Sequence, residues 1–546
     1  MKKDLFSGVG LAAALKEISG VNNLSTGNSI AKPVIHGMFG SRVGIVYDGM
    51  VLENQQWGQD HSPNVDLNAF ENIRLIKGAG LLKYTGDTPG GLIVLESLSP
   101  KIVDSLYGKT IVNTISNGRG INFITSWVRS FQSGIYFKAQ GTIKRSGDYD
   151  TPNYVLTNTG NNEKNFNLIL GRSRITKKWK INLSYFSQEI GILRSSHIGN
   201  VFDLLTAIES NSPSVVRPFS YDIIFPKQLN DHYTSSFQYS LRNKNNGKWN
   251  FKYSWQRNNR KEFDIRRGSD KYDPALDLTL NTHNFVSNYE WSSTLNFNDI
   301  GSFFQVQDNY SDPNTGIKRL IPDYIKIKTG IYFTSNYVPS NQLSLNLGFR
   351  FEHINNEVQK FYRDRRWNSE NYEPELGKYV IQEILSQKLV KRRLIFNTPS
   401  FNIGIRSKFI SFHELSLNFY YTQRSPDIAE MFSDGLHHAI ASIEYGNPFL
   451  KPETTKKFVI NFEKKKGSFK YNLNPYLTLG KNYVILEPDG VEQTIRGAFP
   501  VWEYRSVGAI IKGFDIDLSF KLNQNFELIN NISWIEGINQ KTKIPL

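Results

Sequence analysis

Three histidines and two carboxylates have the side chains and the spacing to bind a metal ion. His437 and His438 are adjacent, Glu444 follows in the same polar segment, and Asp60 and His61 are adjacent near the N-terminus. Neutral imidazole together with carboxylate suits Zn²⁺ or another borderline divalent ion. Neighbouring residues of an extended strand point to opposite faces, so we expect only one of the paired histidines in such a site. Alternatively, these five side chains only join two segments by hydrogen bonds.

Catalytic patterns are not found in the sequence. The chain contains no cysteine, which excludes thiol catalysis, structural disulfides and cysteine-ligated metals. Gly108, Lys109 and Thr110 resemble the end of a phosphate-binding loop, but Val103 stands where its first glycine is needed. Zinc-protease, serine-hydrolase and EF-hand motifs are absent from the sequence. We therefore expect no enzyme, no catalytic residue and no resident cofactor.

Length and composition indicate a large, β-rich protein. The 546 residues exceed one ordinary domain of about 100–200 residues. The mean hydropathy is −0.42, and no apolar run approaches the roughly 20 residues of a membrane-spanning helix. Aromatic residues make up 13% of the chain, which argues against disorder. These features leave a membrane β-barrel or a soluble β protein open.

The net charge of +15 does not by itself indicate nucleic acid. Lysine and arginine are scattered along the chain, whereas nucleic-acid binding gathers them on one helix or stripe. Two short clusters lie beside strand-like sequence, at Arg363, Arg365 and Arg366 and at residues 391–393. Such runs favour solvated loops or strand ends over a phosphate site. We expect no nucleic-acid partner.

A period of two recurs beyond about residue 100 and predicts long strands. Trp249, Phe251, Tyr253 and Trp255 alternate with polar residues, and residues 343–352 and 179–185 repeat the pattern. A soluble sandwich also alternates. Aromatic residues at strand ends, short links such as residues 243–248 and long links such as 194–232 and 355–388 instead favour a membrane barrel with unequal loops.

The residue pattern of the N-terminal part differs from this alternation. Helical spacing of Leu11, Ala14, Leu15 and Ile18, closed by Gly20, predicts a short helix. Residues 42–47, 73–76 and 92–95 read as strands between glycine-rich turns. We therefore expect a compact α/β unit that ends near residue 96.

An ordered series of short motifs in this unit resembles the plug domain of TonB-dependent outer-membrane receptors. The series comprises KPVIHGMFGSRV at residues 32–43, YDG at 47–49, QQWG at 55–58, DH at 60–61, NIRLIKG at 72–78 and GDTPGG at 86–91. Segments at 147–149, 158–160, 189–195 and 197–200 are similar to early barrel strands, especially of zinc-uptake receptors. RSP at 424–426, EMF at 430–432, GNP at 446–448 and LKPE at 450–453 are similar to the late barrel.

The resemblance implies a fold and a function. Residues 1–98 would form the plug and residues 99–546 an antiparallel outer-membrane β-barrel of the 22-stranded type. The protein would import a scarce nutrient, either a metal ion or a chelate such as siderophore-iron or haem, and the TonB-ExbB-ExbD complex would energise it. It would lie in the outer membrane of a Gram-negative bacterium, in contact with lipid. A receptor for saccharides or peptides and a passive porin or surface-binding barrel are the alternatives.

The resemblance also implies that both ends of the usual receptor are missing. We find no signal peptide or TonB box before Leu11, and the chain stops at Leu546 without a terminal aromatic strand. We therefore expect an incomplete barrel that lacks its last strands. A sheet with an open edge would leave unsatisfied backbone groups in lipid, at several kcal/mol each.

Charged residues and glycines of the expected plug have structural roles in this interpretation. Arg42, Asp66, Glu71, Arg74 and Glu96 would pair with the barrel wall and hold the plug in place. Turns and close backbone approaches would require several glycines and one turn aspartate; these are Gly37, Gly40, Asp48, Gly49, Gly78, Gly90 and Gly91.

Overall fold

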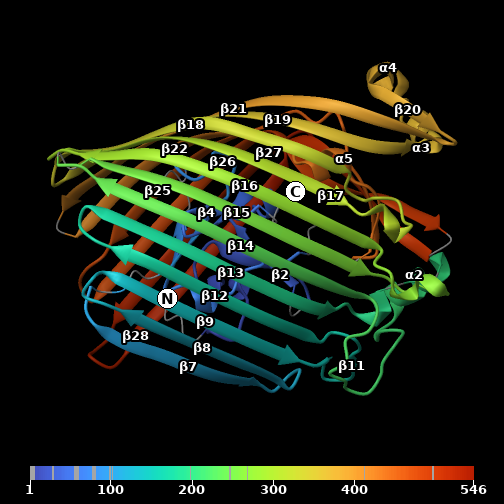
Figure 1. Ribbon diagram of the computed structural model, residues 1–546, viewed down its shortest axis with the longest axis horizontal. Coiled ribbons are helices and arrows are strands. Elements are labelled where there is room, and N and C mark those ends of the chain that lie inside the picture. Colours follow the sequence, from blue (N-terminus) through green and yellow to red (C-terminus); the bar gives the residue numbers. More distant parts are fainter. Residues whose placement is uncertain are drawn as a thin grey trace.

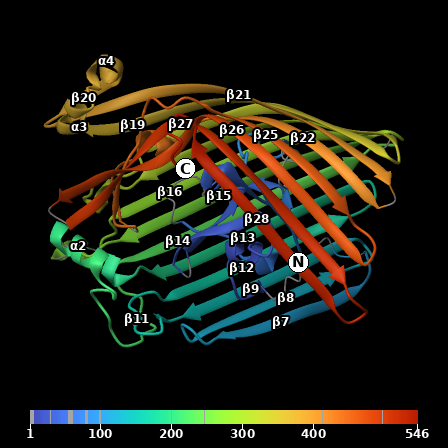
Figure 2. The ribbon, with the colours of Figure 1, turned by 180° about the vertical axis from the view of Figure 1, so that it is seen from behind.

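The computed structural model describes residues 6–27, 30–53, 61–76, 82–97, 100, 102–196, 198, 200–244, 247–266, 268–410, 412–438, 440–494 and 497–546. Within these residues, no helix has the length and apolar character needed to span a membrane. Long, tilted strands surround a smaller unit formed by the first hundred residues, drawn in blue in Figures 1 and 2.

The long strands form a wall whose apolar side chains point outward. On β15 the exposed fraction is 44% for Trp249 and 43% for Tyr253, whereas it is 1% for Ser254 and 4% for Gln256. A soluble sandwich would bury the aromatic face, so this inversion confirms the barrel interpretation. The wall strands are β7 (Ser105–Ile115), β8 (Gly120–Ser130), β9 (Ile135–Ser146), β12 (Asn161–Ser173), β13 (Lys177–Gly191), β14 (Lys227–Arg242), β15 (Lys248–Phe263), β16 (Leu276–Ser292), β17 (Asn296–Ser311), β18 (Asp323–Ser340), β19 (Leu343–Arg363), β21 (Gln387–Ile410), β22 (His413–Arg424), β25 (Glu453–Lys464), β26 (Phe469–Thr494), β27 (Gly497–Lys521) and β28 (Glu527–Asn539).

These strands pair in chain order as an antiparallel sheet, from β7 with β8 through to β27 with β28. The overall order is that of a closed barrel in which β28 stands next to β7. This differs from the open sheet expected from the sequence. At that junction, however, both β7 and the first nine residues of β28 are exposed along most of their length, so this part of the wall has little cover on either face.

Connections at the two ends of the barrel differ in length. Short turns join β14 to β15 and β18 to β19 at one end, whereas residues 192–226 and 425–452 form long loops at the other. The predicted loops were too long. β19 continues to Arg363 and β14 already begins at Lys227, because most outward-facing residues beyond the lipid are polar and the alternation used to recognise the strands is lost.

Short elements lie in the long loops. The strands are β10 (Tyr149–Asp150), β11 (Val155–Leu156), β20 (Val380–Ile384), β23 (Asp434–His437) and β24 (Ser442–Tyr445). The helices are α2 (Val201–Glu209), α3 (Asp364–Ser369), α4 (Glu373–Leu376) and α5 (Ile428–Phe432), with 3-10 turns η5 (Arg194–Ser196), η6 (Ser269–Tyr272), η7 (Pro313–Thr315) and η8 (Gly377–Tyr379).

The N-terminal unit occupies the bore of the barrel in both views. Its sheet has the order β4-β3-β6-β5, and β3 pairs with β6 in parallel. Its core includes Leu15, Ile35 and Ile93, all fully buried. The three predicted strands are confirmed, whereas the helix is shorter than predicted. Its elements are α1 (Leu11–Leu15), β1 (Val21–Gly27), β2 (Ile30–Ile35), η2 (Gly40–Arg42), β3 (Val43–Tyr47), β4 (Met50–Val51), η3 (Leu67–Ala69), β5 (Asn72–Ile76) and β6 (Gly91–Glu96).

Candidate metal-binding site

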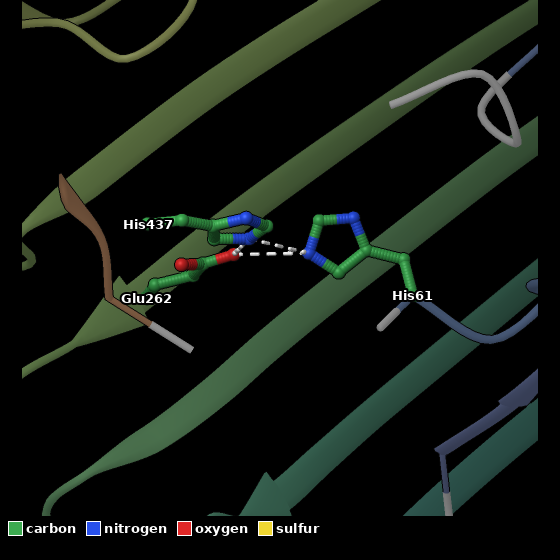
Figure 3. A group of neighbouring side chains, drawn as sticks. All are labelled: His61, Glu262 and His437. Carbon is green, nitrogen blue, oxygen red and sulfur yellow. Dashed lines mark hydrogen bonds and ion pairs between the residues drawn. The ribbon is translucent and has the colours of Figure 1, made fainter. Parts of the chain in front are cut away.

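Two histidines and one glutamate meet where the N-terminal unit touches the wall (Figure 3). Glu262 Oε1 lies 3.1 Å from His61 Nε2 and 3.6 Å from His437 Nε2. The two Nε2 atoms are 3.4 Å apart. All three residues are buried, and one ligand atom from each lies within 4.8 Å of the others. The structure therefore brings His61 and His437 together with a carboxylate that the sequence analysis did not single out.

Three separate elements position these side chains. Glu262 is the penultimate residue of β15, at the end of the barrel that carries the long loops. His437 ends β23, which folds back on β24 within the loop of residues 425–452. His61 comes from the N-terminal unit. The site thus joins the bore unit, the wall and a long loop, so relative movement of any one would take it apart.

Glu444 fixes the orientation of the His437 ring. Its Oε1 lies 2.8 Å from His437 Nδ1, and the two residues lie diagonally across the β23–β24 hairpin. A carboxylate at Nδ1 favours the tautomer that carries its proton there. The lone pair of Nε2 is then directed at Glu262 and His61. Glu444 therefore acts behind the cluster, and is not one of the three grouped ligands.

His438 points away from this cluster. Its Nδ1 lies 3.0 Å from Asp264 Oδ2, so the adjacent histidines serve two different contacts. Asp60, the neighbour of His61, lies outside the described residues. Asp264, like Glu262, was not singled out from the sequence. The available signal was register: Ser254, Gln256 and the alternate residues that follow them face the bore, which places Glu262 there too.

The separations are compatible with a tetrahedral metal site. Zinc binds histidine nitrogen and carboxylate oxygen at about 2.0–2.1 Å, which places neighbouring ligand atoms of a tetrahedron about 3.3 Å apart. The three observed separations of 3.1, 3.6 and 3.4 Å are centred near that value. Ordinary N–H···O bonds are 2.7–3.2 Å long, so two of the three contacts are long for hydrogen bonds.

A buried ion-pair network anchors the N-terminal unit to the wall near this site. Arg42 Nε and Nη2 donate to the carboxylate of Glu453 at 2.9 and 2.6 Å. Arg424 contacts the same carboxylate at 3.1 Å and reaches Glu430 at 2.9 Å. Glu430 belongs to α5, which leads into β23 and His437. The anchor and the cluster of His61, Glu262 and His437 therefore share one loop.

Other predicted wall contacts are partly correct. Lys138 of the wall pairs with Glu71 at 2.6 Å, and Gln140 donates to Asp66 at 2.9 Å. Arg74 and Glu96, in contrast, pair with each other and are partly exposed. They lie on neighbouring strands β5 and β6, where opposite charges meet without needing the wall. For these two residues the expectation of wall contacts is wrong.

The turn residues of the bore unit take the conformations that their types permit. Asp48 has φ of 45° and lies between the wall and Ser97, whose N–H and hydroxyl donate to it. Burial alone would raise the pKa of Asp48, but Lys180 and the bonds from Ser97 hold that pKa below its usual value. Positive φ also occurs at four of the predicted glycines, whereas Gly90 is restricted by space and Gly78 lies outside the described residues; the four are Gly37, Gly40, Gly49 and Gly91.

Family models agree with this architecture. Residues 6–92 match the TonB-dependent receptor plug domain, and residues 106–545 match the TonB-dependent receptor-like β-barrel. The chain therefore belongs to the family of TonB-dependent receptors, whose members are outer-membrane transport proteins. A comparison with curated proteins found no match.

Solved structures share the fold at low sequence identity. The copper transporter OprC superposes with a TM-score of 0.74 at 14% identity, over 99% of this chain and 78% of that one. The hemophore receptor HasR of Serratia marcescens, in complex with its hemophore and heme, gives 0.69 at 15% identity over 97% and 79%. The FrpB iron transporter of Neisseria meningitidis gives 0.69 at 13% over 100% and 81%.

Proposed function

We propose that this receptor binds a divalent metal ion such as Zn²⁺ at His61, Glu262 and His437 and imports it across the outer membrane of a Gram-negative bacterium. In this proposal residues 1–98 act as the plug and residues 99–546 as the barrel. The observation that carries it is the buried His₂Glu cluster, because two imidazoles and one carboxylate are a ligand set that zinc uses in proteins.

The size of the cluster favours a bare ion over a chelate. Its three ligand atoms lie within 4.8 Å of one another and all three residues are buried. A siderophore or haem would need a much wider space to reach the same atoms. A saccharide or peptide would gain nothing from converging imidazoles. The unit that fills the bore argues against a passive porin.

Release follows from the division of the site between two bodies. His61 belongs to the unit in the bore, whereas Glu262 and His437 belong to the barrel and its loop. If TonB-ExbB-ExbD pulls on the plug, His61 leaves with it and the ion keeps two protein ligands of three. The pull would also have to break the ion pair between Arg42 and Glu453. The energy would come from the partner complex, so no catalytic residue is required in this chain.

Metal binding by the purified protein in detergent is the direct test. A competition titration with a chromophoric zinc chelator should show one tight site in the parent protein. We expect His61→Ala and Glu262→Gln each to weaken zinc binding by at least about tenfold, because each removes one ligand. His353→Ala is the matched control, since His353 is exposed on the outer face of the wall and contacts Asn397. Equal zinc affinity in all four proteins would refute the site.

Uptake of radioactive zinc by cells that carry the complete gene tests transport separately. We expect uptake that stops when the proton gradient is dissipated and that falls with His61→Ala but not with His353→Ala. Tight binding without gradient-dependent uptake would retain the site and refute the import function. Uptake of an oligosaccharide, with zinc uptake unchanged by His61→Ala, would refute both.

A further inference from the structure

A second pocket lies in the rim of the barrel, between the β17–β18 loop and the projecting end of β19. Its volume is about 330 Å³. Four of its lining residues are cations and none is acidic: Lys318, Arg319, Lys360 and Arg363. We call this the rim pocket. The sequence analysis favoured solvated loops or strand ends for the cluster that contains Arg363. This arginine is indeed the exposed last residue of β19, and it also lines the rim pocket.

The rim pocket has more cations than carboxylates that pair with them. Lys318 and Lys360 share one carboxylate, Asp434, and Arg319 pairs with Asp323 at 2.7 Å. Among the described residues, no carboxylate lies within ion-pair distance of Arg363. Two positive charges therefore remain without a partner carboxylate. Burial lowers the pKa of Lys318, and Arg363 and Arg366 lower it further while Asp434 opposes them, as expected where cations are crowded.

The rim pocket also contains an open strand edge. β18 pairs with β19 only as far as Gln359, opposite Asp323. Beyond that point β19 continues to Arg363 with a partner on its other side alone, which is β21. Alternate residues of this extension direct their backbone N–H and C=O groups away from β21. These N–H groups add donors to the surrounding side-chain cations.

The pocket faces outward as well as inward. Lys360 and Tyr362 are buried, whereas Gln359, Phe361 and Arg363 are exposed on the outer face of β19. Phe361 is 37% exposed and belongs to the same outward row as the lipid-facing residues lower on this strand. A ligand in the rim pocket can therefore reach it from the region just above the membrane.

We propose that the rim pocket binds a phosphate group through Arg363 and Lys318. A phosphate monoester carries close to two negative charges and accepts hydrogen bonds on three oxygens. This matches the pocket, in which four cations face two carboxylates and several donors are available. Arginine binds phosphate through two parallel N–H groups, and lysine binds it as a point charge. The phosphate could belong to an outer-leaflet lipid headgroup or to a soluble molecule, and the outward opening favours the lipid.

The test uses the whole chain in detergent without added metal, so it does not depend on the proposed import function. Two probes are titrated: inorganic phosphate, and nanodiscs of phosphatidylethanolamine with or without diphosphorylated lipid A. The variant is Arg363→Gln combined with Lys318→Gln. Lys391→Gln is the control, because Lys391 lies on the adjacent strand, is 42% exposed and pairs with Glu357 outside the pocket.

We expect saturable binding of at least one probe, weakened at least tenfold by the double variant and unchanged by the control. Preference for lipid A discs that inorganic phosphate cannot displace identifies a lipid headgroup, and displacement identifies a soluble phosphate. The proposal is overturned if neither probe shows saturable binding. It is also overturned if Lys391→Gln loses as much affinity for the probe as the double variant does. Hydrogen exchange of the β23 amides in the double variant, measured in parallel, reports whether the loop between α5 and β24 remains folded.

Discussion

Glu444 and His437 are diagonal neighbours across a two-stranded hairpin, with Glu444 Oε1 2.8 Å from His437 Nδ1. This contact leaves Nε2 of the ring directed at Glu262 and at His61. The second nitrogen of a metal-binding histidine is commonly held this way, and loss of the holding group weakens metal binding about 10–100-fold. The hairpin therefore fixes both the position and the tautomer of one ligand.

The first prediction concerns this holding group. Glu444→Gln keeps the shape of the side chain but accepts a weaker hydrogen bond, so zinc affinity should fall about 10–100-fold. Glu262→Gln, which removes a ligand, should cost at least as much. A chelator-competition titration measures both. Glu357→Gln serves as control because Glu357 is 42% exposed and pairs with Lys391, away from the cluster. Unchanged affinity in Glu444→Gln would show that Glu444 does not orient the ring.

The second prediction concerns the anchor between Arg42 and Glu453. Arg42→Met should destabilise the plug by about 3 kcal/mol, because the buried Glu453 carboxylate loses one of its two arginine partners and keeps Arg424. Arg74→Met should change the stability by no more than about 0.5 kcal/mol, since its pair with Glu96 is partly exposed. Hydrogen exchange of the β3 amides in increasing urea measures both. Equal effects of the two changes would mean that the anchor is not a stabilising contact of the plug.

The fold could be predicted because the strand pattern and the lengths of the links both indicated a membrane barrel. Alternation of Trp249, Phe251 and Tyr253 with polar residues fixed the strand and its two faces, and unequal links indicated the two ends of the barrel. What the alternation could not give was the length of β19 beyond the lipid. There most outward residues are polar and the inward ones are mixed, so the pattern that marks a membrane strand disappears while backbone pairing with β21 continues.

The candidate site was predictable only in part. Histidine is rare enough in this chain, with nine copies, for His61 and His437 to be noticed by type. Glu262 is one of 50 acidic residues, so its type alone does not single it out. To identify it as a partner of His61, one must know which wall strand lies beside His61. That relationship is set by the packing of two domains, and local sequence does not encode it.

The third prediction concerns Gly90, which a methyl group cannot replace without movement. An added Cβ would lie 2.9 Å from both the carbonyl oxygen of Arg42 and the Cβ of Met38. Gly90→Ala should therefore destabilise the plug by about 1–3 kcal/mol, measured by the same β3 exchange. Gly10→Ala is the control, since no other described residue beyond its chain neighbours has a heavy atom within 4 Å of its added Cβ. A similar small effect at both positions would show that the backbone around Gly90 can yield.

The fourth prediction concerns Asp427, the N-cap of α5, whose side chain accepts a bond from the helix while Glu430 bonds back to it. Burial, reinforced by the negative charge of Glu430 and opposed by Arg424, raises the pKa of Asp427 to about 7. The folded state therefore keeps a proton that the unfolded state loses above its ordinary pKa of 3.8. Because the folded state binds more protons in that window, stability falls as the pH rises from about 4 to 7 and then levels.

Asp427→Asn should remove this fall, because asparagine is also a good N-cap and does not titrate. Hydrogen exchange of the α5 amides between pH 5 and pH 8, corrected for intrinsic exchange, measures the local free energy of opening in both proteins. The parent should open more easily at pH 8 than at pH 5, while the variant stays level. Since α5 leads directly into β23, the same loss of order should loosen His437. Parallel profiles for the two proteins would mean that Asp427 is already ionised at pH 5, and that Arg424 outweighs its burial.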